Sequence, residues 1–135
     1  MITVDACVWV SVLDSSDALH EASVEFWKGI ASKHTVVYAP SFVLVEVGCA
    51  VARRTQSDVN GRNVVAFMRK IPILKLVECD STLINRAIML GAQNLLCAAD
   101  ALYLAVAKQT KTHLITWDKE LILHADAVSP ATWRS

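Results

Sequence analysis

Glycine and proline are scarce in this sequence, with four and three copies among 135 residues. No low-complexity stretch, internal repeat or linker-like segment is visible, so we expect one domain over residues 1–135. Hydrophobic residues make up 54% of the chain and charged ones 19%, which excludes intrinsic disorder. No apolar run reaches the ~18 residues of a membrane span. The first residues carry no basic leader, so we expect no signal peptide and a cytoplasmic protein.

An excess of positive charge is also missing, because thirteen Lys and Arg balance thirteen Asp and Glu. This balance excludes a protein that coats nucleic acid by bulk charge, but not one that binds it through a local patch. Cysteine pairs at metal-binding spacing are absent too. The four cysteines are therefore predicted to be free, buried thiols in a reducing compartment; they are Cys7, Cys49, Cys79 and Cys97.

Short apolar runs alternate with segments of helical periodicity. We expect strands over 2–4, 35–39, 73–77 and 113–116, with a possible edge strand over 127–129. Helices are expected over 6–13, 18–33, 40–54 with Pro40 in the first turn, 58–70, 81–91 closed by Gly91, 98–109 and 118–124. Continuous apolar strands without alternation are typical of a buried parallel sheet. The predicted fold class is a three-layer α/β/α structure around a parallel sheet of four to five strands.

Four carboxylates lie in apolar surroundings where charge is unexpected: Asp5, Glu46, Asp100 and Asp118. Buried acids are rare unless they are paired, and no Lys or Arg lies one helical turn from Glu46 or Asp100. Asp5 follows the predicted strand over 2–4, and Asp118 follows the one over 113–116. Ligands of parallel sheets bind beyond the carboxyl ends of the strands, so both acids are expected at the same edge.

Each acid also has an individual explanation. Asp5 and Asp118 would cap the helices that follow them. Asp100 would face a helix dipole, and Glu46, placed in mid-helix, would pair with a distant arginine. A divalent metal site accounts for all four acids with one cause, since Mg²⁺ and Mn²⁺ prefer hard oxygen ligands.

The same acids carry a resemblance to a known family. The sequence reads V-D-A at 4–6, L-V-E-V-x-x-A at 44–50, A-A-D-A-L-Y-L-A-x-A at 98–107 and L-I-T-W-D at 114–118. In this order it resembles PIN-domain ribonucleases, in particular the VapC-type toxins of toxin–antitoxin pairs. The resemblance implies a catalytic quartet of Asp5, Glu46, Asp100 and Asp118. It implies Asp5, Asp100 and Asp118 as metal ligands, with Glu46 either a ligand or the group that orients the attacking water.

Two positions depart from the family's pattern. Cys7 stands where the family often has Ser or Thr, and we expect its thiol not to replace a hydroxyl as a donor to a carboxylate. The family often has a further acid shortly after the last Asp, and Glu120 is either its counterpart or a solvated charge on a helix.

The expected reaction is metal-assisted hydrolysis of RNA, with Mg²⁺ or Mn²⁺ as cofactor. Thr116, Arg53 and Arg54 are candidate substrate-binding residues, and Trp117 would either stack on a base or pack in the core. The resemblance further implies a homodimer and an antitoxin whose C-terminal segment lies over the acidic groove.

Two other functions remain open at this point. The first is a catalytically silent PIN-like module that only binds RNA or protein, although four intact acids argue against it. The second is a Mg-dependent phosphatase with an aspartyl nucleophile. Such enzymes use a second Asp two residues after the first, where this chain has Cys7.

Overall fold

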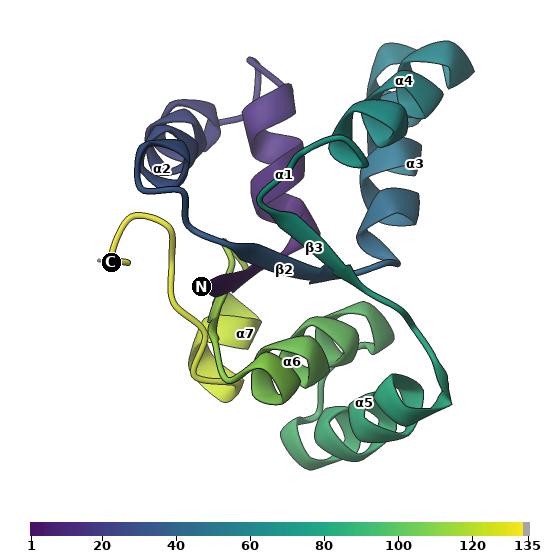
Figure 1. Cartoon of the computed structure of the whole chain (residues 1–135), viewed down its shortest axis with the longest axis vertical. Coiled ribbons are helices and arrows are strands. Elements are labelled where there is room, and N and C mark those ends of the chain that lie inside the picture. The colour runs from purple at the N-terminus through teal and green to yellow at the C-terminus, as the bar shows by residue number, and fades with distance from the viewer. Residues whose placement is uncertain (134–135) are drawn as a thin grey trace.

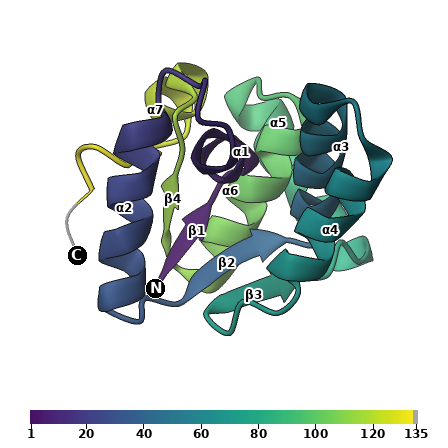
Figure 2. The same ribbon diagram turned by 90° about the horizontal axis from the view of Figure 1, so that it is seen from above.

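The computed structural model describes residues 1–133, so the last two residues of the predicted domain over 1–135 lie outside it. Four parallel strands form one sheet in the order β3-β2-β1-β4. Their bounds are Ile2–Val4 (β1), Val37–Pro40 (β2), Leu74–Val77 (β3) and His113–Ile115 (β4). Figure 2 shows β1 lying between β4 and β2. The four predicted strands over 2–4, 35–39, 73–77 and 113–116 are confirmed in their cores, and the strand count agrees with the expected four to five.

Helices cover both faces of the sheet (Figure 1). The helices are Ala6–Leu13 (α1), His20–Ser32 (α2), Val43–Thr55 (α3), Asp58–Met68 (α4), Ser81–Asn94 (α5), Ala98–Thr110 (α6) and Lys119–His124 (α7). Figure 1 shows α1 to α4 on one side of the sheet and α5 to α7 on the other. The predicted three-layer α/β/α architecture is therefore confirmed.

The core lies between these layers and explains the continuous apolar strands. Strand residues such as Val4, Val37 and Ile115 are fully buried because helices cover both faces of the sheet. Within residues 1–133, no single helix is long and apolar enough to span a membrane, although α5 and α6, bent by 110°, together reach that length and composition.

Pro40 does not begin a helix, which corrects the prediction. It is the last residue of β2 and pairs in register with Val77 of β3. The next residue, Ser41, donates its backbone N–H to the carbonyl of Val77 across 2.7 Å. A proline is tolerated at a strand end because only one ladder donor is lost there, and α3 begins three residues later.

Gly91 does not close its helix either. Helix α5 continues to Asn94 and ends at Leu95, which adopts a left-handed conformation with φ 55°. A Cβ on Gly91 would lie 2.9 Å from the Cβ of Ala101. The glycine therefore serves the close packing of α5 on α6 rather than helix termination.

Helix α3 is less buried than its apolar sequence indicated. Its inner residues Val43 and Val47 are buried, but the Val45 side chain is 54% exposed. On one flank α3 meets α4 at two glycines, where a Cβ on Gly61 would lie 2.7 Å from the carbonyl oxygen of Gly48. Helix α3 is therefore buried along only part of its surface.

The predicted edge strand over 127–129 is reduced to a single parallel bridge between Val128 and Ile115. Val128 donates its N–H to the carbonyl of Leu114 at 2.8 Å and accepts from the N–H of Thr116 at 3.1 Å. The C-terminal segment therefore covers the outer edge of β4 and holds the backbone where β4 ends.

Candidate active site at the carboxyl edge of the sheet

Asp5 is buried at the junction of β1 and α1, with 6% of its surface exposed. It is the N-cap residue of α1, yet its side chain makes no capping hydrogen bond. Its Oδ2 atom instead accepts from the Thr116 hydroxyl at 2.6 Å and the Cys7 thiol at 2.9 Å. Burial raises the pKa of Asp5, these two donors oppose the rise, and the charge of Asp100 adds to it. The capping explanation is therefore not realised for Asp5.

The Cys7 thiol acts as a hydrogen-bond donor to the carboxylate, so the expectation that it cannot replace a hydroxyl is wrong. Burial and the neighbouring Asp5 charge raise the pKa of Cys7, which keeps the proton on sulfur. The same Sγ accepts the backbone N–H of Trp117 at 3.3 Å. Sulfur is larger and more polarisable than oxygen and remains a weak donor.

The loop from Thr116 to Asp118 is fixed by neighbouring side chains. The Thr116 hydroxyl, which donates to Asp5, accepts the N–H of Asp118 at 2.9 Å. The indole N–H of Trp117 donates to Oγ of Ser23 on α2 at 2.8 Å. Trp117 is thus held against the core, as its packing explanation requires. Asp118 caps α7, accepting the N–H of Glu120 at 2.7 Å through Oδ1, so the capping explanation does hold for Asp118.

Glu46 lies in the first turn of α3 rather than in mid-helix, because α3 begins only at Val43. Its Oε2 accepts from the hydroxyl of Tyr103 on α6 at 2.5 Å. Burial raises the pKa of Glu46, the Tyr103 bond opposes this rise, and the charges of Asp5 and Asp100 increase it. Tyr103 is a site residue that was not predicted from the sequence. Its signal was a lone hydroxyl three residues after Asp100 in an apolar helix.

Asp100 lies in the first turn of α6, as expected. Its Oδ2 accepts from the thiol of Cys97, the N-cap residue of that helix, at 3.0 Å. The position also suits interaction with the positive end of the helix dipole. The helix dipole therefore accounts for the position of Asp100, and its charge also acts on Asp5 and Glu46.

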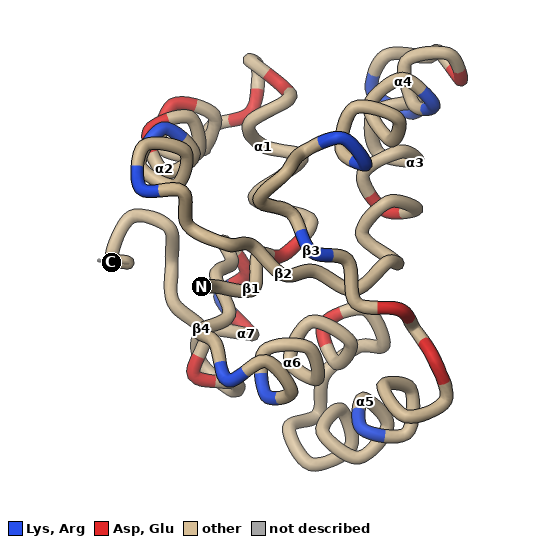
Figure 3. Tube along the Cα trace, in the orientation of Figure 1, with Lys and Arg blue, Asp and Glu red and all other residues tan. Residues whose placement is uncertain are grey.

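Three of the four predicted acids, each from a different element, are coupled through their charges. The charge of Asp100 acts on Asp5, and the charges of both act on Glu46. The charge of Asp118 is not among these causes, and the Thr116 hydroxyl links Asp118 to Asp5. Figure 3 shows acidic segments on α3, on α6 and near the end of β1.

None of these four acids forms an ion pair within residues 1–133, where the salt bridges involve other carboxylates. The distant arginine proposed as the partner of Glu46 is thus not found there. In the same part of the chain, no three His, Cys, Asp or Glu side chains form a ready-made metal site. The donor set nevertheless fits a hard divalent cation, since it consists of like-charged carboxylates stabilised only by neutral donors.

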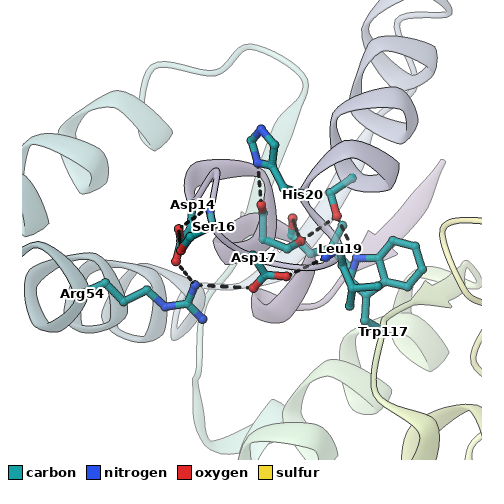
Figure 4. Close-up of polar contacts among 10 residues, drawn as sticks. Asp14, Ser16, Asp17, Leu19, His20, Arg54 and Trp117 are labelled. Atoms are coloured by element: carbon teal, nitrogen blue, oxygen red, sulfur yellow. Dashed lines mark hydrogen bonds and ion pairs between the residues drawn. The ribbon is translucent and has the colours of Figure 1, made fainter.

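The predicted substrate-binding arginines lie at the far end of α3. Arg54 pairs with Asp14 and with Asp17, the latter at 3.4 Å, and so joins α3 to the α1–α2 loop (Figure 4). Hydrogen bonds from Ser16 are the main cause that lowers the pKa of Asp14 to about 2, and the contact with Arg54 lowers it further. Arg53 is exposed. The structure brings neither arginine to the acids.

Two further predictions concern residues around the site. The cysteines are free but not buried as predicted: Cys49 and Cys97 are exposed, and Cys7 and Cys79 are partly exposed. Cys49 lies on α3, which α4 covers only in part, and Cys97 precedes α6, which explains their exposure. The exposed Glu120 side chain lies 3.3 Å from His124 on α7, which agrees with a helix-surface charge.

Comparison with known proteins identifies the fold. The PIN domain family model matches residues 2–127. The solved structure of VapC20 from Mycobacterium tuberculosis, described as a sarcin-ricin loop cleaving toxin, has 21% identity and a TM-score of 0.78, covering 93% of this chain and 95% of its own.

Two more solved structures share the fold. FitAcB from Neisseria gonorrhoeae has 18% identity and a TM-score of 0.74, with 98% and 100% of the two chains covered. A toxin–antitoxin complex from Klebsiella pneumoniae has 14% identity and a TM-score of 0.71, with 96% and 98% covered. Among curated proteins, none matches the chain.

Proposed function

Because this chain belongs to the PIN-domain family, we propose that it is a metal-dependent endoribonuclease and the toxin of a cytoplasmic toxin–antitoxin pair. One observation carries the proposal: the charge of Asp100 raises the pKa of Asp5, the charges of both raise that of Glu46, and none of the three acids has a cationic partner within residues 1–133. Such an arrangement is unfavourable in an empty site and favourable around a divalent cation.

The proposed ligands are Asp5, Asp100 and Asp118. When bound, Mg²⁺ or Mn²⁺ supplies a water of lowered pKa and charge stabilisation at the scissile phosphate. Asp5 offers Oδ1, because Oδ2 already receives Thr116 and Cys7. Asp118 offers Oδ2, because Oδ1 caps α7. Both aspartates are therefore restrained before any ligand binds.

Glu46 is assigned the orientation of the attacking water, or a place as a fourth ligand. Its Oε2 is engaged by Tyr103, which leaves Oε1 for a water or a cation. The raised pKa of Glu46 makes its carboxylate a stronger proton acceptor than an ordinary glutamate. No Ser or Cys nucleophile is required, and the donor bonds of Cys7 assign that thiol to positioning.

RNA is the proposed substrate, since cleavage of the sarcin-ricin loop is described for a protein of the same fold. Thr116 stands at the site, but its hydroxyl already links Asp5 and Asp118. Arg53 remains a proposed phosphate contact, whereas Arg54 is engaged with Asp14 and Asp17. We expect weak, salt-dependent binding because so few cations take part.

The direct test is cleavage of a panel of structured RNAs by the wild type with Mn²⁺, with EDTA, and by Asp5→Asn. We expect cleavage that needs the metal and falls at least about 100-fold in the variant. Asp58→Asn is the matched control, because Asp58 is an exposed acid paired with Arg62 on α4. Cleavage that persists in Asp5→Asn would reject the proposed site, and a wild type that binds RNA without cutting it would favour a binding module.

An antitoxin and a second copy of the chain are the proposed partners. Their support is the toxin–antitoxin complex of the same fold and the apolar surface of α5, where Ile88 and Met89 are exposed. Size-exclusion chromatography with light scattering tests the dimer, and Ile88→Glu should yield a folded monomer. A monomeric wild type at micromolar concentration would contradict the dimer but leave the nuclease proposal untouched.

A further inference from the structure

Tyr103 connects two helices that carry different acids of the site. Its side chain is fully buried, and its hydroxyl donates to Oε2 of Glu46 at 2.5 Å. Tyr103 belongs to α6 and Glu46 to α3, a separation of 57 residues in sequence. A buried tyrosine hydroxyl needs a partner, but a backbone carbonyl would have met that need without engaging a carboxylate of the site.

The position of Tyr103 on its own helix is equally informative. It lies three residues after Asp100, and residues three apart occupy the same side of a helix. One face of α6 therefore supplies Asp100 directly and reaches Glu46 through the tyrosine hydroxyl. Helix α3 packs mainly on α4 and α1, so this hydrogen bond gives Glu46 a fixed relation to Asp100 that helix packing alone does not provide.

The hydroxyl is a permanent donor in this setting. Burial is the main cause that raises the pKa of Tyr103, and the Glu46 charge adds to it. The carboxylate can accept but not donate while it is ionised. The bond therefore runs from the Tyr103 hydroxyl to the ionised Glu46 carboxylate.

We propose that Tyr103 is a positioning residue: its hydroxyl holds Oε2 of Glu46 beside Asp100 and leaves Oε1 as the oxygen that meets a divalent cation or its water. This inference rests on the proposed function, because it assumes that the acids bind a cation. Hydrogen bonds of this kind behind a metal ligand commonly change metal affinity by about 10- to 100-fold.

The inference can be tested without any RNA by measuring how tightly the full chain binds Mn²⁺. Electron paramagnetic resonance monitors binding through the loss of the free-ion signal. Tyr103→Phe keeps the ring and removes only the hydroxyl, and we expect its Kd for Mn²⁺ to rise about tenfold. Tyr38→Phe is the matched control, because within residues 1–133 the Tyr38 hydroxyl hydrogen-bonds only to Met1 Sδ, at 3.8 Å; its Kd should match the wild type.

A double-mutant cycle separates positioning from general packing. Glu46→Gln removes the charge that Tyr103 orients, so the loss caused by Tyr103→Phe should largely vanish in that background. Equal losses in both backgrounds, or a Tyr103→Phe protein that binds Mn²⁺ like the wild type, would overturn the inference.

If Tyr103→Phe does not fold, Glu46→Asp provides a second test. Its carboxylate is one methylene shorter and cannot keep the Tyr103 bond while reaching the same point. We expect a similar rise in Kd, and wild-type affinity in Glu46→Asp would reject the inference. A wild type that binds no Mn²⁺ would instead reject the proposed function, so the two failures can be told apart.

Discussion

The hydroxyl of Thr116 donates to Oδ2 of Asp5 at 2.6 Å and accepts the backbone N–H of Asp118 at 2.9 Å. One side chain thus joins the ends of the neighbouring strands β1 and β4, which each lead into an acid of the candidate site. The bond compensates a buried carboxylate without adding a positive charge, so the site keeps its attraction for cations.

Thr116→Val should therefore damage both stability and metal binding. Valine has nearly the same shape but leaves Asp5 without its shortest donor and the N–H of Asp118 without an acceptor. We expect a loss of about 1–3 kcal/mol in the free energy of unfolding, measured by urea denaturation in EDTA, and weaker Mn²⁺ binding. Thr55→Val, whose exposed hydroxyl bonds only to its own helix, should change stability by less than about 0.5 kcal/mol. Equal effects of the two substitutions would contradict this role of Thr116.

Replacing Cys7 distinguishes the need for a donor from the need for sulfur. Cys7→Ser keeps a donor next to Asp5, so we expect its affinity for Mn²⁺ to stay within about threefold of the wild type. Cys7→Ala removes the donor and the acceptor for Trp117 N–H, and we expect affinity to fall about tenfold. Isothermal titration calorimetry of the three proteins with Mn²⁺ provides the comparison. An alanine variant with undiminished affinity would show that the thiol only fills space.

The raised pKa values of Asp5 and Glu46 predict how stability depends on pH without metal. The folded protein binds protons more tightly than the unfolded chain, whose carboxyls titrate near pH 4. Stability from these groups is thus present at low pH and lost as pH rises through the raised values. Asp14, whose pKa is lowered to about 2, changes the stability at more acidic pH than Asp5 and Glu46 do.

Asp5→Asn should remove much of this loss, because the amide keeps an acceptor for Thr116 without the charge. In EDTA at pH 7.5 we expect its Tm to exceed that of the wild type by about 3–6 °C, with a smaller difference at pH 5. Asp58→Asn, at an exposed acid, should follow the wild type across this range. Differential scanning calorimetry measures all three, and a wild type that gains stability from pH 5 to 7.5 in EDTA would contradict the prediction.

The contact between α3 and α4 can be tested with two glycines. Gly61→Ala places a methyl group 2.7 Å from the Gly48 carbonyl oxygen, so the helix that carries Glu46 has to shift. We expect a loss of about 2 kcal/mol or more. A Cβ on Gly29 in α2 meets nothing within 4 Å, and Gly29→Ala should stabilise the protein by up to about 1 kcal/mol. Thermal unfolding compares the variants, and equal effects at both positions would refute the close contact.

Much of the fold was predictable because the strands are buried on both faces and their apolar runs stand out. The boundaries that failed depend on tertiary contacts. Proline suits the start of a helix, but Pro40 pairs with β3 and ends a strand instead. Glycine suits the end of a helix, but Gly91 lies inside α5, where the close contact with Ala101 leaves no room for a larger side chain. Local preference describes what a residue allows, and packing selects among the options.

Within the candidate site, the acids were recognisable because charge is conspicuous in an apolar sequence. Their donors were not. Tyr103 and Cys97 look like ordinary helix residues until folding places them beside Glu46 and Asp100. The contribution of Cys7 was misjudged because a weak donor was treated as no donor, whereas folding places its thiol 2.9 Å from Oδ2 of Asp5. The partners of Arg54 come from a loop about forty residues away, which no local pattern indicates.

The two outer strands of the sheet differ in how they would meet another protein. The bridge from Val128 occupies the outer side of β4, so a foreign strand finds no free backbone groups at that position. At the opposite end β3 has one strand neighbour, and the exposed Lys75 lies in it. A charged side chain in such a strand discourages edge-to-edge stacking. Edge-to-edge addition of a foreign strand is therefore expected at β3 rather than beside the bridge on β4, and replacing Lys75 with an apolar residue would remove that safeguard.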